Sequence, residues 1–316
     1  MASLKDLQNR IKSVKSIQKI TKAMQMVATA KLRKAQDAAE RARPYSDRIG
    51  AVIANLSASM VGEGGAGSEG APKLLVGNGK TDVHLLVVAT ADRGLCGGFN
   101  TNIVRKAREE IVKLEGDGKT VKVFCIGRIG EGQLNRLYGD KIIKTVSLKE
   151  HKTLTGAIAA ELGGEITAMF DAGEFDVCKL IYSQFENVMT QVPTIKTMIP
   201  AIGGSAIDDM GTQSGEGGNH TSDDVFAPDL KGAAYEYEPD EEGILKTLLP
   251  RNINTQILSA LLENVAGEMG SKMAAMDNST RAAGDLIDKL TLTFNRSRQA
   301  QITSELIEII SGAEAL

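Results

Sequence analysis

The chain has 316 residues, of which 42% are hydrophobic, 24% are charged and 4% are aromatic. No stretch approaches the roughly 18 uninterrupted apolar residues that span a membrane, and the start, MASLKDLQNR, lacks the apolar region of a signal peptide. The low aromatic share fits a helical rod better than a thick multilayer core. Cys96, Cys125 and Cys178 have no metal-binding spacing, which indicates buried free thiols.

Residues 1–61 are predicted to form one long helix. Between positions 4 and 56 the sequence contains one proline and, at position 50, one glycine, and most residues are good helix formers. Apolar residues recur at steps of three and four and predict a buried seam, locally overwound where two threes follow each other. A helix of roughly 75 Å needs a partner along its length. The predicted seam residues are Leu4, Leu7, Ile11, Val14, Ile17, Ile20, Met24 and Val27.

The middle of the chain contains two segments with different sequence patterns. Residues 62–80 are rich in glycine, and we interpret them as a flexible linker. Residues 81–202 alternate short apolar runs with helix signals, which predicts a central Rossmann-like α/β domain with a mainly parallel sheet. Strands are expected at 83–90, 121–126, 141–146, 177–185 and 194–199, and helices at 101–114, 130–138 and 154–170.

The last third of the chain begins with an acidic stretch. Residues 203–243 contain 11 Asp and Glu against one Lys, and we interpret 203–232 as a flexible acidic insertion. Residues 233–250 are expected to supply a last strand and a connection, and 251–316 a second long helix. Two long terminal helices predict an antiparallel coiled coil, a shaft with the α/β domain inserted at one end.

The first helix is strongly basic, with 12 Lys and Arg against 4 Asp and Glu in residues 1–48. A solvated face is the ordinary explanation, and an acidic partner, whether a protein surface, nucleic acid or anionic lipid, is the functional one. The first 44 residues contain no aromatic residue, which argues against nucleic-acid binding because such segments usually carry stacking side chains.

Motifs for catalysis are missing from the sequence. Gly94, Gly97 and Gly98 follow the first strand, but their spacing differs from the phosphate-binding motifs and no lysine follows them. A tight turn explains them better. The three histidines are dispersed and match no metal or nucleophile pattern. We expect no catalytic residue, cofactor or metal, and keep a nucleotide-binding α/β protein with coiled-coil arms as the alternative.

Three segments carry a resemblance to a known family: Arg10–Val14 with Gln18–Ala28, Asp92–Asn100, and Ile302-Thr303-x-Glu305-x-x-Glu308-x-x-x-Gly312-Ala313. Together they resemble the gamma subunits of F-type rotary ATP synthases of the bacterial type. The resemblance implies a non-catalytic rotor shaft inside a ring of three alpha and three beta subunits, standing with the epsilon subunit on the membrane-embedded c ring. Proton-driven rotation of that ring would turn the shaft and cycle the catalytic sites that make ATP from ADP and phosphate.

The same resemblance implies which residues meet the partners. Lys19, Lys22 and Met24 match the residues that face the acidic lever loop of the catalytic subunits. Arg298, Gln299, Thr303 and Glu305 match those that meet the upper part of the ring. Contacts with epsilon and the c ring are matched by Tyr235, Tyr237, Glu238 and Asp240. We expect a peripheral protein on the cytoplasmic face of the bacterial inner membrane, which touches the membrane only through the c ring and binds no nucleic acid. The insertion at 203–232 lacks cysteine, so the thiol regulation of chloroplast-type members is not expected.

Overall fold

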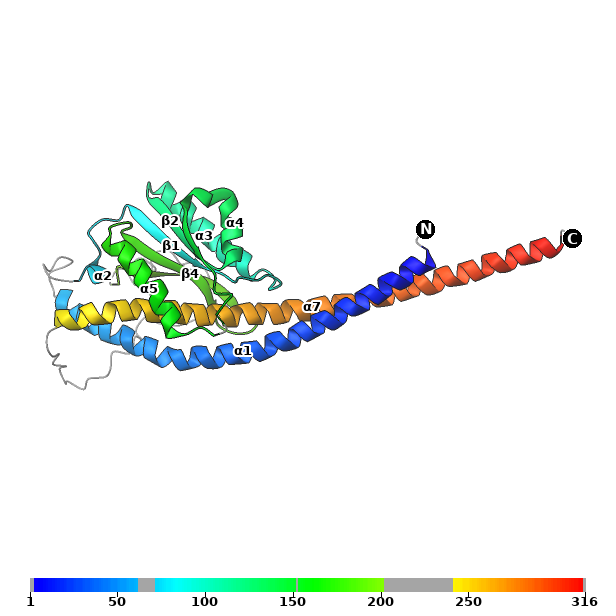
Figure 1. Ribbon diagram of the computed structural model, residues 1–316, viewed down its shortest axis with the longest axis horizontal. Coiled ribbons are helices and arrows are strands. Elements are labelled where there is room, and N and C mark those ends of the chain that lie inside the picture. Colours follow the sequence, from blue (N-terminus) through cyan, green and yellow to red (C-terminus); the bar gives the residue numbers. More distant parts are fainter. Residues whose placement is uncertain (1–2, 62–71, 152, 202–240, 315–316) are drawn as a thin grey trace, which may run out of the picture.

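The computed structural model describes residues 3–61, 72–151, 153–201 and 241–314. A rod of two helices carries a small α/β domain near one of its ends (Figure 1). The elements in chain order are α1 (Leu4–Val61), α2 (Lys73–Val76), β1 (Val83–Ala89), α3 (Phe99–Gly116), β2 (Thr120–Ile126), α4 (Arg128–Tyr138), a 3-10 turn (Gly139–Lys141), β3 (Ile142–Val146), α5 (Gly156–Asp171), β4 (Val177–Phe185), β5 (Gln191–Ile199) and α7 (Glu241–Glu314).

The rod consists of α1 and α7, which run in opposite directions and confirm the predicted antiparallel coiled coil. Residues with higher sequence numbers in α7 contact residues with lower sequence numbers in α1. Because α7 has 74 residues and α1 has 58, the C-terminal part of α7 projects beyond the N-terminus of α1 (Figure 1). The contacts are Leu56, Ile53 and Ile49 with Leu245 and Leu249; Ala35 and Leu32 with Ala266 and Met269; and Thr21 with Thr280.

The domain is built on a five-stranded sheet in the order β3-β2-β1-β4-β5. The first four strands are parallel, as expected, and β5 is antiparallel to β4. Leu86 and Val88 face a core with α3 and α4, whereas Leu85 and Val87 face a core with α5 and α7. The strand β1 is buried on both faces, which explains why His84 is its only polar residue. The helix α7 is therefore both half of the rod and one outer layer of the domain.

Two expected segments differ in the structure. The helix α2 lies inside the expected linker at 62–80, and Leu75 is completely buried against residues of α1 and α7. Where residues 233–250 were expected to supply a strand and a connection, α7 already begins at Glu241 and contains Pro250. Burial of Leu245 and Leu249, each worth about 1.5–3 kcal/mol, offsets the roughly 3 kcal/mol that an interior proline costs a helix. Residues 203–240 lie outside the described part of the chain.

The seam between the two helices differs from the prediction. The expected seam through Ile17, Ile20 and Val27 is wrong, because these side chains are 53%, 58% and 57% exposed. Apart from the half-buried Met24, the buried and half-buried positions from Leu7 to Ala35 alternate steps of four and three without a break, so the seam needs no local overwinding. They are Leu7, Ile11, Val14, Gln18, Thr21, Gln25, Ala28, Leu32 and Ala35 on α1, opposite Ser297, Phe294, Leu290, Ile287, Ala283, Thr280 and Met276 on α7.

Candidate functional site

The crevice at the carboxyl ends of the strands is the first place to look for a ligand. In open parallel sheets, ligands bind where the strand order reverses, which here is between β1 and β4. Asn264 of α7 occupies this point. Its Nδ2 donates to the carbonyl oxygen of Ala89 at 2.8 Å, and its Oδ1 accepts from the backbone N–H of Ser183 at 3.0 Å. The shaft helix thus joins the two central strands where a nucleotide would lie in other folds of this kind.

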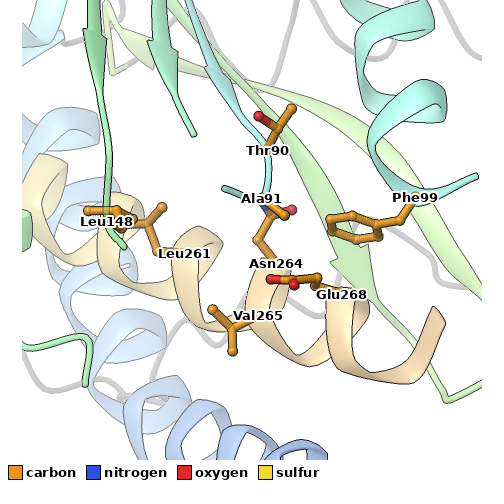
Figure 2. A pocket seen from close by; sticks show the side chains of 8 residues that line it. All are labelled: Thr90, Ala91, Phe99, Leu148, Leu261, Asn264, Val265 and Glu268. Carbon is orange, nitrogen blue, oxygen red and sulfur yellow. The ribbon is translucent and has the colours of Figure 1, made fainter. Parts of the chain in front are cut away.

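The space left beside Asn264 is a cavity of about 30 Å³ (Figure 2). Ligand pockets usually measure about 300–1,000 Å³, so this cavity has room for ordered water and not for a nucleotide. The close packing of α7 keeps it small, since an added Cβ at Gly267 would lie 2.9 Å from the Phe99 ring. Its lining residues are Thr90, Ala91, Phe99, Leu148, Leu261, Asn264, Val265 and Glu268.

The glycine-rich loop that follows β1 is a tight turn, as expected, and it is held by Asp92. The Asp92 carboxylate accepts hydrogen bonds from the backbone N–H groups of Arg128 and Leu148 and from the Ser147 hydroxyl, at 2.8–3.1 Å. These bonds tie together the loops that follow β1, β2 and β3. Gly97 has a φ of +57° and lies next to α7, since an added Cβ would be 3.9 Å from Cβ of Ala275. The loop therefore braces the domain against the shaft.

Two further contacts fix α7 to the antiparallel strand pair. The Ser271 hydroxyl donates to Oε1 of Gln191 at 2.6 Å. The Glu263 carboxylate accepts from the backbone N–H of Phe185 at 3.2 Å, and burial raises its pKa above the ordinary glutamate value. From about Ile253 to Ala275, α7 is an integral part of the domain.

Beyond this region the rod exposes an apolar and basic surface on α1. We call Ile17, Ile20, Met24 and Val27 the α1 stripe. Three of the four are more than half exposed, and Met24 is half-buried. Two of the expected contact residues, Lys19 and Lys22, lie beside them and are also exposed. A contiguous exposed apolar patch with charges at its edge is typical of a protein-binding surface.

The end of α7 exposes a second surface. Every side chain described from Arg298 onward is exposed, including the predicted contacts Gln299, Thr303 and Glu305. The sequence analysis did not predict that an apolar face of this helix extends past the end of α1. Pairing the two helices residue by residue in antiparallel order would have shown that the longer C-terminal helix projects beyond the N-terminal one. The exposed apolar residues of this tip are Ile302, Leu306, Ile307, Ile309 and Ile310.

Other expectations from the sequence divide into those that are observed and those outside the described residues. All three cysteines are free and buried, as predicted. Tyr235, Tyr237, Glu238 and Asp240 lie in the undescribed range and stay predictions. No helix in the described ranges is both long and apolar enough to cross a membrane. Within the same ranges, no three His, Cys, Asp or Glu side chains gather as a metal site.

Comparison with known proteins identifies the family. The sequence model described as ATP synthase matches residues 3–316. The chain is 61% identical to the ATP synthase gamma chain of Maricaulis maris and 57% identical to that of Rhizobium rhizogenes, in each case over 316 residues and the full length of both chains. The chain belongs to the ATP synthase gamma chain family. Its function is therefore that of the rotor subunit of ATP synthase, which is non-catalytic.

Solved structures share the fold of this gamma chain. A chain of the Euglena gracilis mitochondrial ATP synthase, from an OSCP/F1/c-ring structure, has a TM-score of 0.65 at 17% identity and covers 99% of this chain and 94% of its own. A chain of the Tetrahymena thermophila central stalk and c ring has a TM-score of 0.59 at 23% identity, covering 82% and 98%. The two long helices and the parallel-rich sheet are thus the fold of a central stalk.

Proposed function

We propose that this gamma chain transmits rotation of a c ring to a ring of three alpha and three beta subunits, where ATP is made from ADP and phosphate. The observation that carries the proposal is the separation of two regions on one rod. The domain grips α7 up to about Ala275, and beyond that point both helices present exposed apolar and basic side chains. The similar Euglena structure contains F1 and c-ring components and the similar Tetrahymena structure a central stalk and c ring, which supports the same assembly here.

The α1 stripe and its lysines are proposed to meet the catalytic subunits. Lys19 and Lys22 would face acidic loops of the beta subunits, and Met24 would meet the same loops from its position beside them on α1. Opposite charges of this kind steer and orient partners more than they add affinity, which suits a contact that must be broken and remade in every turn. Arg298, Gln299, Thr303 and Glu305 would meet the upper part of the ring.

Coupling is proposed to arise from the asymmetry of the rod. The α1 stripe occupies one side of one helix, so a turning shaft would offer it to the three catalytic sites in succession. A contact that favours one conformation of a site shifts the population of that site toward it. The alternation of contacts would drive each site through open, loose and tight states and release ATP.

The domain end of the rod is proposed to stand on the c ring with the epsilon subunit, through Tyr235, Tyr237, Glu238 and Asp240. This arrangement places the chain at the cytoplasmic face of the bacterial inner membrane, as a peripheral protein that touches the membrane only through the c ring. We describe the domain as Rossmann-like, supported by the order β3-β2-β1-β4 and qualified by the antiparallel β5. The shaft would comprise 1–61 and 241–314, because α7 begins at Glu241, and it would be joined to the domain at 81–202 through 62–80 and 203–240.

The alternative, a nucleotide-binding protein with coiled-coil arms, finds little support at the sheet crevice. Asn264 uses both ends of its amide to bind β1 and β4 there. A nucleotide at this point would have to displace α7 and break the domain core.

Co-purification tests the proposed assembly. A tag with a long linker on a beta subunit is used to isolate the complex from its native cells, and its native mass and ATPase activity are measured. We expect one copy of this chain with three alpha–beta pairs, together with epsilon and the c ring, and robust ATPase activity. Recovery of the alpha–beta ring without this chain would contradict the proposal, and nucleotide binding by the isolated chain would favour the alternative.

A further inference from the structure

The middle of the rod has polar contacts where a coiled coil normally has apolar ones. The hydroxyls of Thr21 and Thr280 lie 2.8 Å apart, and Nε2 of Gln25 donates to Oδ1 of Asp277 at 2.9 Å. Nε2 of Gln18 donates to the Thr280 carbonyl oxygen at 3.4 Å. We call these five residues the polar seam. Polar residues at such positions cost stability and, in return, select one arrangement of the helices.

The α1 stripe lies immediately beside the polar seam. Each stripe residue precedes a seam position by one: Ile17 before Gln18, Ile20 before Thr21, Met24 before Gln25 and Val27 before Ala28. One residue corresponds to about 100° around a helix. Turning this part of α1 by that angle would bury the α1 stripe against α7 and move the polar residues into water. Burial of apolar surface alone favours that turned setting, because it removes three exposed branched side chains from water.

Contacts from α7 are fitted to the setting that is observed. Gly284 leaves room for the side chain of Gln18, since a Cβ added at position 284 would lie 3.2 Å from Nε2 of Gln18. Lys22 donates from Nζ to Oε1 of Gln25 at 3.1 Å, so the same glutamine joins Asp277 to an exposed lysine. Hydrogen bonds have directions, whereas apolar contacts do not, and only the observed setting satisfies these bonds.

We propose that the polar seam is a rotational lock, and that Asp277 and Thr280 are positioning residues that keep the α1 stripe turned outward. They act through Gln25 and Thr21. The identity of the partner rests on the proposed function, but the rotational setting of α1 is a property of this chain alone. The lock explains why a rod exposes isoleucines while it buries threonine and glutamine.

The test measures thiol reactivity in the isolated full chain. Two separate reporters are made, Ile20→Cys at a position that is 58% exposed and Ala28→Cys at a position that is 1% exposed. The native cysteines are at most 2% exposed and supply a low background. Each reporter is combined with Asp277→Ala/Thr280→Ala, which removes the Asp277 acceptor and the Thr280 hydroxyl. The matched control, Asp277→Asn/Thr280→Ser, keeps an acceptor oxygen at 277 and a hydroxyl at 280 while also losing the Asp277 charge that pairs with Arg281.

With the lock intact, a maleimide reagent is expected to modify Cys at position 20 much faster than Cys at position 28. In the alanine pair we expect the first rate to fall and the second to rise, each by about tenfold, because one hydrogen bond shifts an equilibrium by roughly three- to tenfold. The asparagine–serine pair should keep the original rates. Unchanged rates in the alanine pair would overturn the proposal. Fast modification at both positions would also overturn it, since the helices would then have separated instead of turning.

Coupled ATP synthesis by the assembled complex separates this inference from the proposed function. The alanine pair should lower synthesis, and the asparagine–serine pair should restore it. If the thiol rates reverse but synthesis is unchanged, the lock is real and the contact of the α1 stripe with the catalytic ring is refuted. If the thiol rates do not reverse, the lock is refuted, whatever the synthesis rate.

Discussion

Gly267 shows how closely α7 lies against the sheet. An added methyl group would lie 2.9 Å from the buried ring of Phe99 and 3.4 Å from Cγ of Gln191. We therefore expect Gly267→Ala to lower the free energy of unfolding by about 1–3 kcal/mol, as overpacking does. Urea unfolding of the full chain measures this value. The matched control is Gly164→Ala on α5, which meets nothing within 4 Å and should gain about 0.5–1 kcal/mol in helix propensity. Equal stability of the two variants would contradict the tight packing.

His84 gives the domain a pH dependence. Its side chain is buried, and its Nδ1 has no hydrogen-bond partner among the described residues. Burial, followed by the charge of Lys179, lowers the pKa of His84 below its ordinary value. Unfolding then takes up a proton, so the contribution of His84 to stability is present above its unfolded pKa of about 6.5. It is lost as the pH falls through the lower folded pKa.

Thermal unfolding between about pH 7.5 and 5.5 checks this behaviour. We expect the melting temperature of the native chain to fall toward acid more steeply than that of His84→Leu. The exposed His151 provides the control, because His151→Asn should keep the native slope. Parallel slopes for the native chain and His84→Leu would show that protonation of His84 does not matter.

Among the elements, α3 and β4 are joined by a buried ion pair. Nζ of Lys179 lies 2.7 Å from Oε1 of Glu110, and the two side chains are 10% and 9% exposed. Lys179→Met leaves the Glu110 carboxylate buried without its partner, so we expect a loss of about 3–5 kcal/mol. Replacing both, with Glu110→Leu, should recover most of this loss because no charge is left buried. Guanidinium unfolding measures all three chains, and a double variant no more stable than the single one would contradict this account.

Elements of the domain could be predicted because their signals are local. The strand β1 has six buried residues in a row after the half-buried Val83, and short, mostly apolar runs of that kind have few other interpretations. The seam of α1 could not be predicted by counting apolar residues. Its position depends on Thr21 meeting Thr280, 259 residues away, and on a heptad that runs unbroken from Leu7 to Ala35. The sequence indicates the helix, whereas its rotation is a tertiary property.

The contact residues are predicted only by resemblance to a family. The side chains of Lys19, Lys22 and the C-terminal residues are exposed, and their contacts with partners stay predictions. The role of Asn264 carried almost no signal. With Glu263 it is one of two polar residues between Leu261 and Val265, and only the fold brings β1 and β4 to the two ends of its amide.

For the molecule as a whole, the exposed tip of α7 predicts a separation of stability from function. Deleting residues from Gln299 onward removes only side chains that are exposed or outside the described set. The melting temperature of the chain should therefore stay the same, while coupled ATP synthesis by the assembled complex falls several-fold. A full-length chain with serine at Ile302, Leu306 and Ile309 distinguishes lost apolar contacts from lost length. Unchanged synthesis in both chains would mean that the tip makes no functional contact.

The grip of the domain on α7 has a mechanical consequence. A rod held firmly over part of its length behaves as a beam with a clamped end, so it bends and twists in its free part. Here the clamp extends to about Ala275, where Gly97 meets the helix. The free length begins with Met276 and includes the polar seam, where hydrogen bonds between side chains join the two helices. Elastic energy from a turning base would therefore be stored next to the residues that decide which way α1 faces.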